Sequence, residues 1–464
     1  MNALAWEADA WAADLAQHAD LPDERLNQRL ADILAIFARK SHDSIPQACS
    51  SLAATKATYR FFANHRVRVE QLHDAVAAAT VERCRGQATV LAIHDTTSLN
   101  YSTLTGTGGL GPIGSSGTAQ GLHLHSTLAL RTDGVALGLL HQECWSRPAE
   151  QRQGRYQLVP IEQKESGKWL LGIGGSNDAL AGLAQPERPR VIHVMDRESD
   201  IHEVLESIAG ATDGCVIRSV RNRRIEEPLG YAHDAVAQAP LLGIHTVAVA
   251  AQPGQTRRTA RMELRAVAVT IQPPRLYAAQ AQRRPFVIHL VEAREVATAA
   301  ATPLHWLLWT TEAASTFDQA VGVLRLYQHR WKIEDFHLLL KSGCRVEELE
   351  LETAERLTKA VVIYSAVAAH LLALRDLARV EPDAPCTTIL SDDAWKALWL
   401  HIHQKRLTAH VPAPTVRQAV LWIGRLGGHL NRKRDGMPGV RTLWRGYRDL
   451  GLLVLGYRLA RDTR

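Results

Sequence analysis

Three acidic residues are placed where they could hold divalent metal ions. Asp95 ends the apolar run ATVLAIHD, Asp196 follows the apolar run VIHVM, and Glu334 lies in a segment with helical spacing. Three carboxylates form an all-oxygen ligand set, which suits Mg²⁺ or Mn²⁺ and not zinc. Two such ions, about 3.5–4 Å apart, activate a water or a 3′-hydroxyl and stabilise the leaving oxygen of a phosphodiester. The acids therefore indicate metal-dependent phosphoryl transfer, although a lone Asp after a strand is more often a turn or cap residue.

Groups that bind phosphate accompany the glutamate. At about 100° per residue, one face of a helix predicted over residues 317–342 carries a phenol, a guanidinium, a carboxylate and an ammonium. These groups belong to Tyr327, Arg330, Glu334 and Lys341. A second, buried stripe is expected about a quarter-turn away, formed by Phe317, Leu324, Trp331 and Leu338. Ser315 with Asp318 predicts the capping box that begins this helix, and Gly343 its end. Ordinary i,i+4 pairing on a surface helix would produce the same Arg-Glu-Lys row.

Hydrophobic patterns predict the strands that carry the two aspartates. Residues 88–95 and 191–198 are rich in Val, Ile, Leu and Ala, which is typical of strands buried on both faces. Residues 122–130 predict a third strand. The glycine-rich loop before it lacks the Gly-Lys-Ser/Thr ending of a phosphate-binding loop.

Helices are expected on both sides of this region. In residues 1–70, the run RLNQRLADILAIFARK repeats its apolar residues on one helical face, formed by Leu26, Leu30, Ile33, Leu34 and Phe37. Its basic residues lie off that face, as a solvated surface or a surface for DNA phosphates: Arg25, Arg29, Arg39 and Lys40. A second long helix is expected over 355–379, followed by a linker over 381–393 and a small helical domain in the tail.

Residues 215–300 predict strands and turns with a strong excess of arginine. Two clusters contain Arg218, Arg221, Arg223, Arg224, and then Arg257, Arg258, Arg261, Arg265, Arg275, Arg283 and Arg284. Such clusters form either solvated surface or a phosphate-binding surface. Arg218 is the candidate DNA contact of this region.

Composition limits the class of protein. The chain has 464 residues and a formal net charge of +6, which allows nucleic-acid binding without requiring it. Its 6 cysteines are scattered, which supports neither a zinc ribbon nor a disulfide framework and fits a reducing cytosol. The N-terminus lacks the pattern of a signal peptide. The apolar stretch 360–374 is too short for a membrane span, so no membrane partner is expected.

Several motifs together resemble a known family, the DDE transposases of the insertion-sequence-four family and in particular its Tn-five-like branch. The resemblance is carried by LAIHDTTSLNY around Asp95, VMDRESDIHEV around Asp196 and YQHRWKIEDFHLLLKSG around Glu334. HQECWSRP, KESGKW and GRLGGHLNRKRDG add to it. The third motif keeps every spacing of the family's Tyr-Arg-Glu-Lys signature. The N-terminal basic residues match the family less closely, which bears on end-sequence specificity and not on the chemistry.

The resemblance implies an α/β fold with an RNase H-like (retroviral-integrase-like) catalytic core over residues 71–380 and a β-rich insertion at about 215–300. It further implies a helical domain for transposon-end DNA over residues 1–70 and a helical dimerisation domain over residues 381–464. The three acids would bind Mg²⁺ or Mn²⁺, as two ions. Partners would be transposon-end DNA, target DNA and a second copy of the chain in a synaptic complex, in the bacterial cytosol near the nucleoid.

The same resemblance assigns DNA contacts. Tyr327, Arg330 and Lys341 would hold phosphates near the cut. Trp306 matches the residue whose ring stacks in the pocket for a flipped base, whereas a buried core tryptophan is the alternative. Three charged residues beside Asp196 are expected to form local salt bridges rather than to bind metal: Arg197, Glu198 and Asp200.

Three functions fit these features. An active cut-and-paste transposase would nick the ends, form a hairpin, reopen it and join the ends to target DNA; the hairpin rests on the resemblance alone. A non-catalytic DNA-binding regulator derived from such an enzyme is the alternative, against which the intact acids, Arg330 and Lys341 argue. A general RNase H-like nuclease explains the acids but not the basic β region or the tail.

Overall fold

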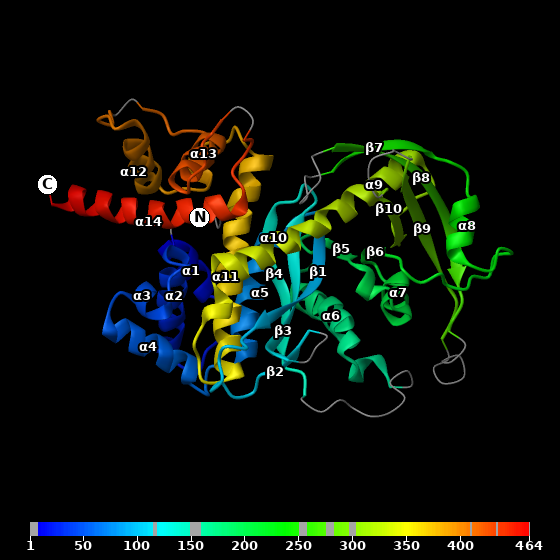
Figure 1. Cartoon of the computed structure of the whole chain (residues 1–464), viewed down its shortest axis with the longest axis horizontal. Helices are drawn as coiled ribbons and strands as arrows, with labels where there is room; N and C mark the ends of the chain where they lie inside the picture. Colours follow the sequence, from blue (N-terminus) through cyan, green and yellow to red (C-terminus); the bar gives the residue numbers. More distant parts are fainter. Residues whose placement is uncertain are drawn as a thin grey trace.

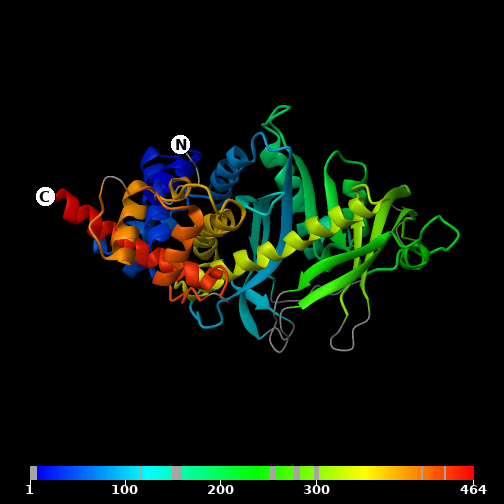
Figure 2. The same cartoon turned by 90° about the horizontal axis from the view of Figure 1, so that it is seen from above.

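The molecule is elongated, with a twisted sheet in its middle and at one end (Figures 1 and 2). The N- and C-terminal helices lie together at the other end (Figure 1). The computed structural model describes residues 8–114, 118–148, 159–249, 258–274, 283–296, 303–408, 411–432 and 435–463.

Ten strands of the described chain form one mixed sheet, in the order β2-β3-β1-β5-β6-β10-β9-β8-β7, with β4 paired to β3. The strands are β1 (Thr89–Asn100), β2 (Gly111–Ile113), β3 (Ala119–Arg131), β4 (Ala136–Trp145), β5 (Arg190–Met195), β6 (Gly214–Arg218), β7 (Gly243–Val249), β8 (Arg258–Ile271), β9 (Phe286–Glu295) and β10 (His305–Thr310). Strands β1, β5 and β6 are parallel, whereas the other neighbouring pairs are antiparallel. The strands expected in 215–300 are present, with the helix α8 (Ala232–Gln238) as an element that the pattern did not predict.

The position of Asp95 differs from the expectation of a strand end. Strand β1 continues to Asn100, because its antiparallel pairing with β3 runs on from Asp95 to that residue. The parallel pairing of β1 with β5 stops at Ile93. Asp95 is therefore in the middle of a strand but just beyond the last pair of the parallel ladder. Asp196, in contrast, directly follows β5 as expected.

The helical segment that carries Glu334 is interrupted. It consists of α9 (Phe317–Gln328), a 3₁₀ turn (His329–Trp331), α10 (Lys332–Leu338) and a π-helical turn (Leu339–Gly343). The capping box is formed by Thr316 and Gln319, one residue later than predicted, because the Thr316 hydroxyl accepts from the amide of Gln319.

The predicted apolar stripe on this segment is wrong in part. Trp331 is 59% exposed, whereas Ile333 and Phe336 are fully buried. The 3₁₀ turn, which includes Trp331, winds the chain more tightly than an α-helix, so its residues do not keep the 100° spacing that placed Trp331 beside Leu324.

A long apolar helix, α11 (Ala354–Val380), lies at the centre of the described structure (Figure 1). It contacts α2, α4, α5, β4, α13 and α14. Its length and composition would allow it to cross a membrane, but its apolar window is 100% buried inside the protein. The helix is longer than the apolar stretch seen in the sequence, and its burial is that of a core helix.

The two ends of the chain are helical and share a core with α11 and with part of the sheet. The N-terminal helices are α1 (Ala8–Ala16), α2 (Glu24–Arg39), α3 (Ile45–Cys49), α4 (Leu52–Ala63) and α5 (Val69–Cys84). On α2, Leu30, Ile33, Leu34 and Phe37 are buried and Leu26 is partly buried against the same core, which confirms the predicted stripe. The C-terminal helices are α12 (Asp392–His403), α13 (Val416–Leu426) and α14 (Val440–Asp462).

The segment 381–393 is packed rather than a free linker. Cys386, Ile389 and Leu390 are buried in the shared core, and the Cys386 amide donates to the carbonyl of Pro414. Two α-helices of the described chain remain, α6 (Lys168–Leu180) and α7 (His202–Ala209), and they pack against each other. Helix α6 also contacts β3 and β4, and helix α7 contacts β6 and β9.

Candidate active site

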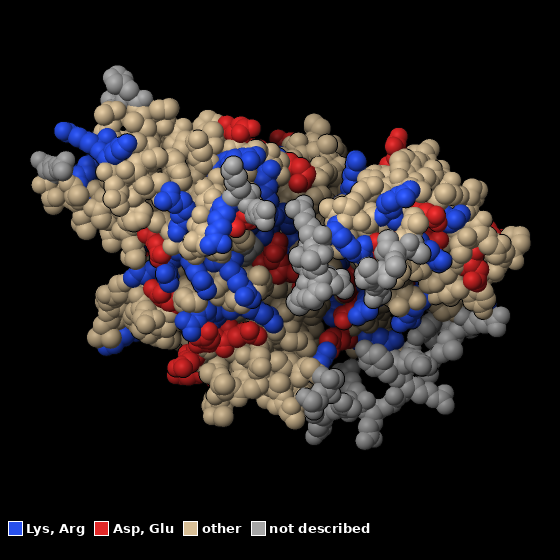
Figure 3. Space-filling model, turned by 45° about the horizontal axis from the view of Figure 1, so that its top comes forward, with Lys and Arg blue, Asp and Glu red and all other residues tan. Residues whose placement is uncertain are grey.

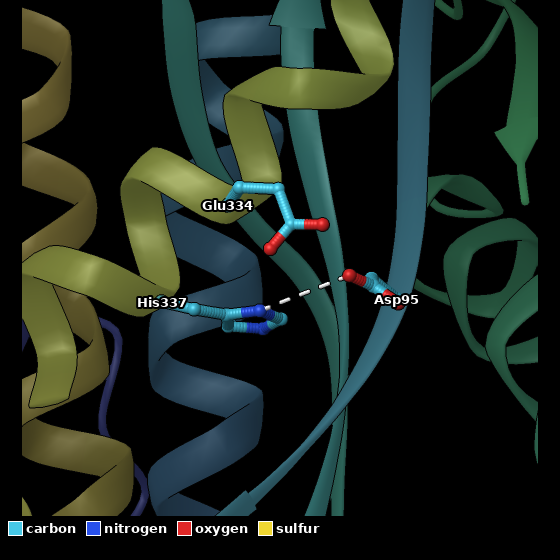
Figure 4. Close-up of side chains that lie close together, drawn as sticks. All are labelled: Asp95, Glu334 and His337. Atoms are coloured by element: carbon cyan, nitrogen blue, oxygen red, sulfur yellow. Dashed lines mark ion pairs between the residues drawn. The ribbon is translucent and has the colours of Figure 1, made fainter. Parts of the chain in front are cut away.

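Asp95 and Glu334 come together as the sequence predicted, and His337 joins them (Figure 4). Asp95 projects from β1, while Glu334 and His337 project from neighbouring turns of α10. One potential ligand atom of each residue lies within 4.8 Å of the other two, and the imidazole Nδ1 is 3.9 Å from the Asp95 carboxylate. Among the described residues, no other group of three or more such side chains reaches this spacing.

Arg330 lies between the two acids. Its guanidinium is 3.3 Å from the carboxylate of Glu334 and 3.9 Å from that of Asp95, and its side chain is 10% exposed. The i,i+4 pairing that was the alternative for this row is therefore present. Because the same guanidinium also faces Asp95, the pair belongs to the acid cluster, in which the Glu334 side chain is 46% exposed.

The cluster has an excess of negative charge that burial makes costly. Burial, with the nearby Glu334 and Asp196 carboxylates, raises the pKa of Asp95 to about 7. Burial also lowers the pKa of His337 to about 3, so its imidazole is neutral at neutral pH. Arg330 contacts two of the carboxylates, and the third, Asp196, feels the charges of Arg330 and Lys168 without a contact to Arg330. A bound cation would relieve the repulsion that raises the pKa of Asp95.

Asp196 is near this group but outside the 4.8 Å set. It caps the turn after β5, where its carboxylate accepts a 2.8 Å hydrogen bond from the amide of Glu198. Burial raises the pKa of Asp196. The cap role raised as an alternative is therefore observed, and it holds the carboxylate at the open end of the parallel strands.

The predicted phosphate-binding residues line up beside β1 and β10. Lys341 donates a 2.5 Å hydrogen bond to the carbonyl of Ser98 on β1, and its ammonium is 3.6 Å from Glu347. Tyr327 is buried, and its ring meets that of Trp306 edge to face at 5.8 Å. Trp306 is partly buried and packs against the core.

Arg218 and its neighbours are largely held within the protein. The Arg218 guanidinium donates to the carbonyl of His305 at 2.7 Å. Arg223 and Arg258 form ion pairs with Asp200 and Glu295. Exposed arginines of the same region without a described ion pair are Arg221, Arg261 and Arg284, while Arg257 and Arg275 lie outside the described residues.

The local salt bridges expected beside Asp196 are present for Asp200 and Glu198, whereas the structure describes no ion pair of Arg197. Asp200 is 1% exposed and pairs with Arg223 at 2.5 Å, while also accepting from the amides of Val220 and Arg221. Glu198 lies 3.6 Å from the buried ammonium of Lys168.

Two residues of the site escaped the sequence analysis. His337 is three residues after Glu334, so the spacing Glu-x-x-His already placed both side chains on one helical face. Its Nε2 atom is buried without a hydrogen-bond partner among the described residues. Trp331 was assigned to the core, but its exposed ring lies against the Arg330 guanidinium, 4.7 Å from the ring centroid.

Two family models match the ends of the chain. Residues 8–67 match a transposase DNA-binding model. Residues 366–464 match a model of the Tn5 transposase dimerisation domain. The matches support a Tn5-like transposase that binds DNA through its N-terminal region and forms homodimers through its C-terminal region. The acid cluster lies in the part of the chain between them.

Proposed function

We propose that this protein is a DDE-type, cut-and-paste DNA transposase of the insertion-sequence-four family, with Asp95, Asp196 and Glu334 as its metal-binding acids. The observation that carries the proposal is the convergence of Asp95 and Glu334, with one guanidinium, between regions that match DNA-binding and dimerisation models. The parallel strands β1, β5 and β6, extended by antiparallel β3 and β4, support an RNase H-like core.

The residues fit hard divalent ions. Two carboxylates with ligand atoms within 4.8 Å, and a third whose charge reaches Asp95, offer oxygen ligands of the kind that Mg²⁺ and Mn²⁺ prefer. Both other carboxylates raise the pKa of Asp95, so the three acids would hold the ions together. Such ions supply an activated water or 3′-hydroxyl and stabilise the leaving oxygen of a phosphodiester.

The cationic side chains would then hold the DNA. Arg330 faces both Asp95 and Glu334, and Lys341 is anchored on β1 close by. A backbone phosphate beside the acids would contact the Arg330 guanidinium and the Lys341 ammonium without a change of fold. Lys and Arg are numerous on the face of the molecule shown in Figure 3, around a recess in which acidic side chains are visible. This distribution suits a polyanion that crosses the middle of the molecule.

Cleavage of a transposon-end duplex tests the proposal. With Mg²⁺ or Mn²⁺, the protein should nick the end, and Asp95→Ala, Asp196→Ala and Glu334→Ala should each reduce the rate at least about 10³-fold, equivalent to about 4 kcal/mol. Binding of the same duplex should persist, since the variants keep the DNA-binding region. Cleavage at the normal rate by the Glu334→Ala protein would refute the assignment. Binding without cleavage by the unaltered protein would favour the regulator.

A further inference from the structure

The helix that carries Glu334 is held from its opposite side by a second group of charges. Lys332 and Asp335, which flank Glu334 on α10, contact Arg375 and Asp376 on α11. The Lys332 ammonium is 2.5 Å from Asp376, and the Arg375 guanidinium is 2.7 Å from Asp335 and 2.8 Å from Asp376. We call these four residues the α10–α11 charge cluster.

The backbone around α10 leaves its orientation dependent on such contacts. The helix has 7 residues and is bounded by a 3₁₀ turn on one side and a π-helical turn on the other. Both departures interrupt the regular hydrogen-bond ladder that would otherwise fix α10 relative to α9. A small rotation of α10 about its axis would move the Glu334 carboxylate away from Asp95.

The charge cluster is buried enough to resist that rotation. The side chain of Asp376 is 0% exposed, that of Arg375 is 4% exposed and that of Lys332 is 19% exposed. One oxygen of Asp376 accepts from both cations, while the other has no hydrogen-bond partner among the described residues. The side chain of Asp335 is 38% exposed. Burying the other three charges costs desolvation energy that apolar residues would avoid, and such clusters can instead fix one packing arrangement.

We propose that the α10–α11 charge cluster is a positioning device for Glu334, through which the affinity for divalent metal depends on the C-terminal segment. Arg375 and Asp376 lie inside the 366–464 match to the dimerisation model, so this segment reaches the residues on either side of the ligand. The inference rests on the proposed function, because it needs Asp95 and Glu334 to hold metal. It assigns no contact with metal or DNA to the cluster itself.

Binding of Mn²⁺ alone to the full chain, measured by calorimetry, tests the proposal without any cleavage assay. Lys332→Met should raise the Kd about tenfold or more, as loss of a residue that orients a ligand does. In that variant Asp376 still forms its ion pair with Arg375, so no buried charge loses every partner. Lys332→Arg keeps the charge and should restore affinity to within about twofold of the unaltered protein. Asp335→Asn is the second variant and should weaken binding in the same direction.

A matched control separates positioning from a loss of stability. Asp393→Asn removes a carboxylate that pairs with two arginines, Arg458 and Arg461, in the C-terminal helices and away from α10. It should leave the Kd for Mn²⁺ unchanged. Normal Mn²⁺ affinity in folded Lys332→Met and Asp335→Asn proteins would overturn the positioning role alone. If Asp95→Ala leaves the Kd for Mn²⁺ unchanged, Asp95 does not bind the metal, and both proposals are overturned.

Discussion

The charges on the two sides of α10 differ in how completely their partners neutralise them. Toward β1, Glu334 meets Asp95, with Asp196 nearby, and Arg330 contacts the acids at 3.3 and 3.9 Å. Toward α11, two acids and two bases balance one another with contacts of 2.5–2.8 Å. Most of these side chains are buried, but those of Glu334 and Asp335 are 46% and 38% exposed. The same short helix therefore combines a neutralised cluster with one that has more negative charge than its surroundings compensate.

This difference distinguishes charges that stabilise the fold from charges that a bound ligand would neutralise. A balanced, tightly paired cluster is destabilised most by loss of the member that two others share, because their charges are then left buried with fewer partners. An uncompensated cluster stores unfavourable energy in the metal-free protein, so loss of one acid should be tolerated or even favourable for folding. Proteins retain such energy at sites whose ligand relieves it. Stability measurements on the two sides should thus give opposite signs.

The largest effect is expected on the side of α11. Asp376→Ala removes the fully buried carboxylate that both Lys332 and Arg375 contact. It should lower the free energy of unfolding by about 3–5 kcal/mol, because two cations lose their shared partner. Urea denaturation followed by circular dichroism measures this loss. A loss below about 1 kcal/mol would mean that the cluster is not structurally required.

An effect of opposite sign is expected for Asp95→Asn in the presence of EDTA. The folded state raises the pKa of Asp95 from 3.8 to about 7, so the ionised carboxylate destabilises the metal-free protein. The penalty is complete above pH 7 and disappears as the pH falls toward 4, since the folded state then binds the proton. At pH 8 the variant should gain about 1–3 kcal/mol of stability, less than the full shift would give.

The pH dependence supplies the control for this prediction. The amide oxygen of Asn can still accept the hydrogen bond that Asp95 receives from Thr96. The advantage of the Asn variant should therefore shrink at pH 5, where Asp95 is already protonated in the folded protein. An equal advantage at pH 5 and pH 8 would show that charge is not its origin.

The smallest effect is expected for an ion pair outside both clusters. Lys396 and Asp392 form an i,i+4 pair on α12 at 2.7 Å, with side chains 30% and 67% exposed. Lys396→Met should change the free energy of unfolding by no more than about 0.5 kcal/mol, because water and salt screen an exposed pair. Thermal unfolding of the two proteins side by side is sufficient to measure it. A change as large as that of Asp376→Ala would show that burial does not distinguish the clusters.

The sequence predicts which residues form the acid cluster more accurately than it predicts their positions within strands and helices. Asp95, Glu334 and Arg330 were found, because residue type and spacing within one segment are local properties. The place of Asp95 within β1 was missed, because the end of the strand is set by pairing with β3, which is distant in sequence. Trp331 was misplaced because an interrupted helix does not keep a constant angle per residue.

The α10–α11 charge cluster could not be predicted. Lys332 and Asp376 are 44 residues apart, and nothing in either segment specifies the other as its partner. On α10 itself, Lys332 and Asp335 look like the polar face of any surface helix. The proximity of His337 to Glu334 could be predicted, since their spacing is local. An isolated histidine does not indicate a site, however, until a second acid lies beside it in space.

The central position of α11 has a consequence for synthesis of the chain. Its residues provide partners for helices made much earlier: Phe37 stacks on Tyr364, and the buried ammonium of Lys359 donates to the carbonyl of Phe62, 297 positions before it. At about 5–20 residues per second, that delay lasts roughly 15–60 s on the ribosome. During this time the apolar faces of the N-terminal helices lack their cover, so the nascent chain is a candidate for chaperone binding and folds slowly through contacts between its most distant parts.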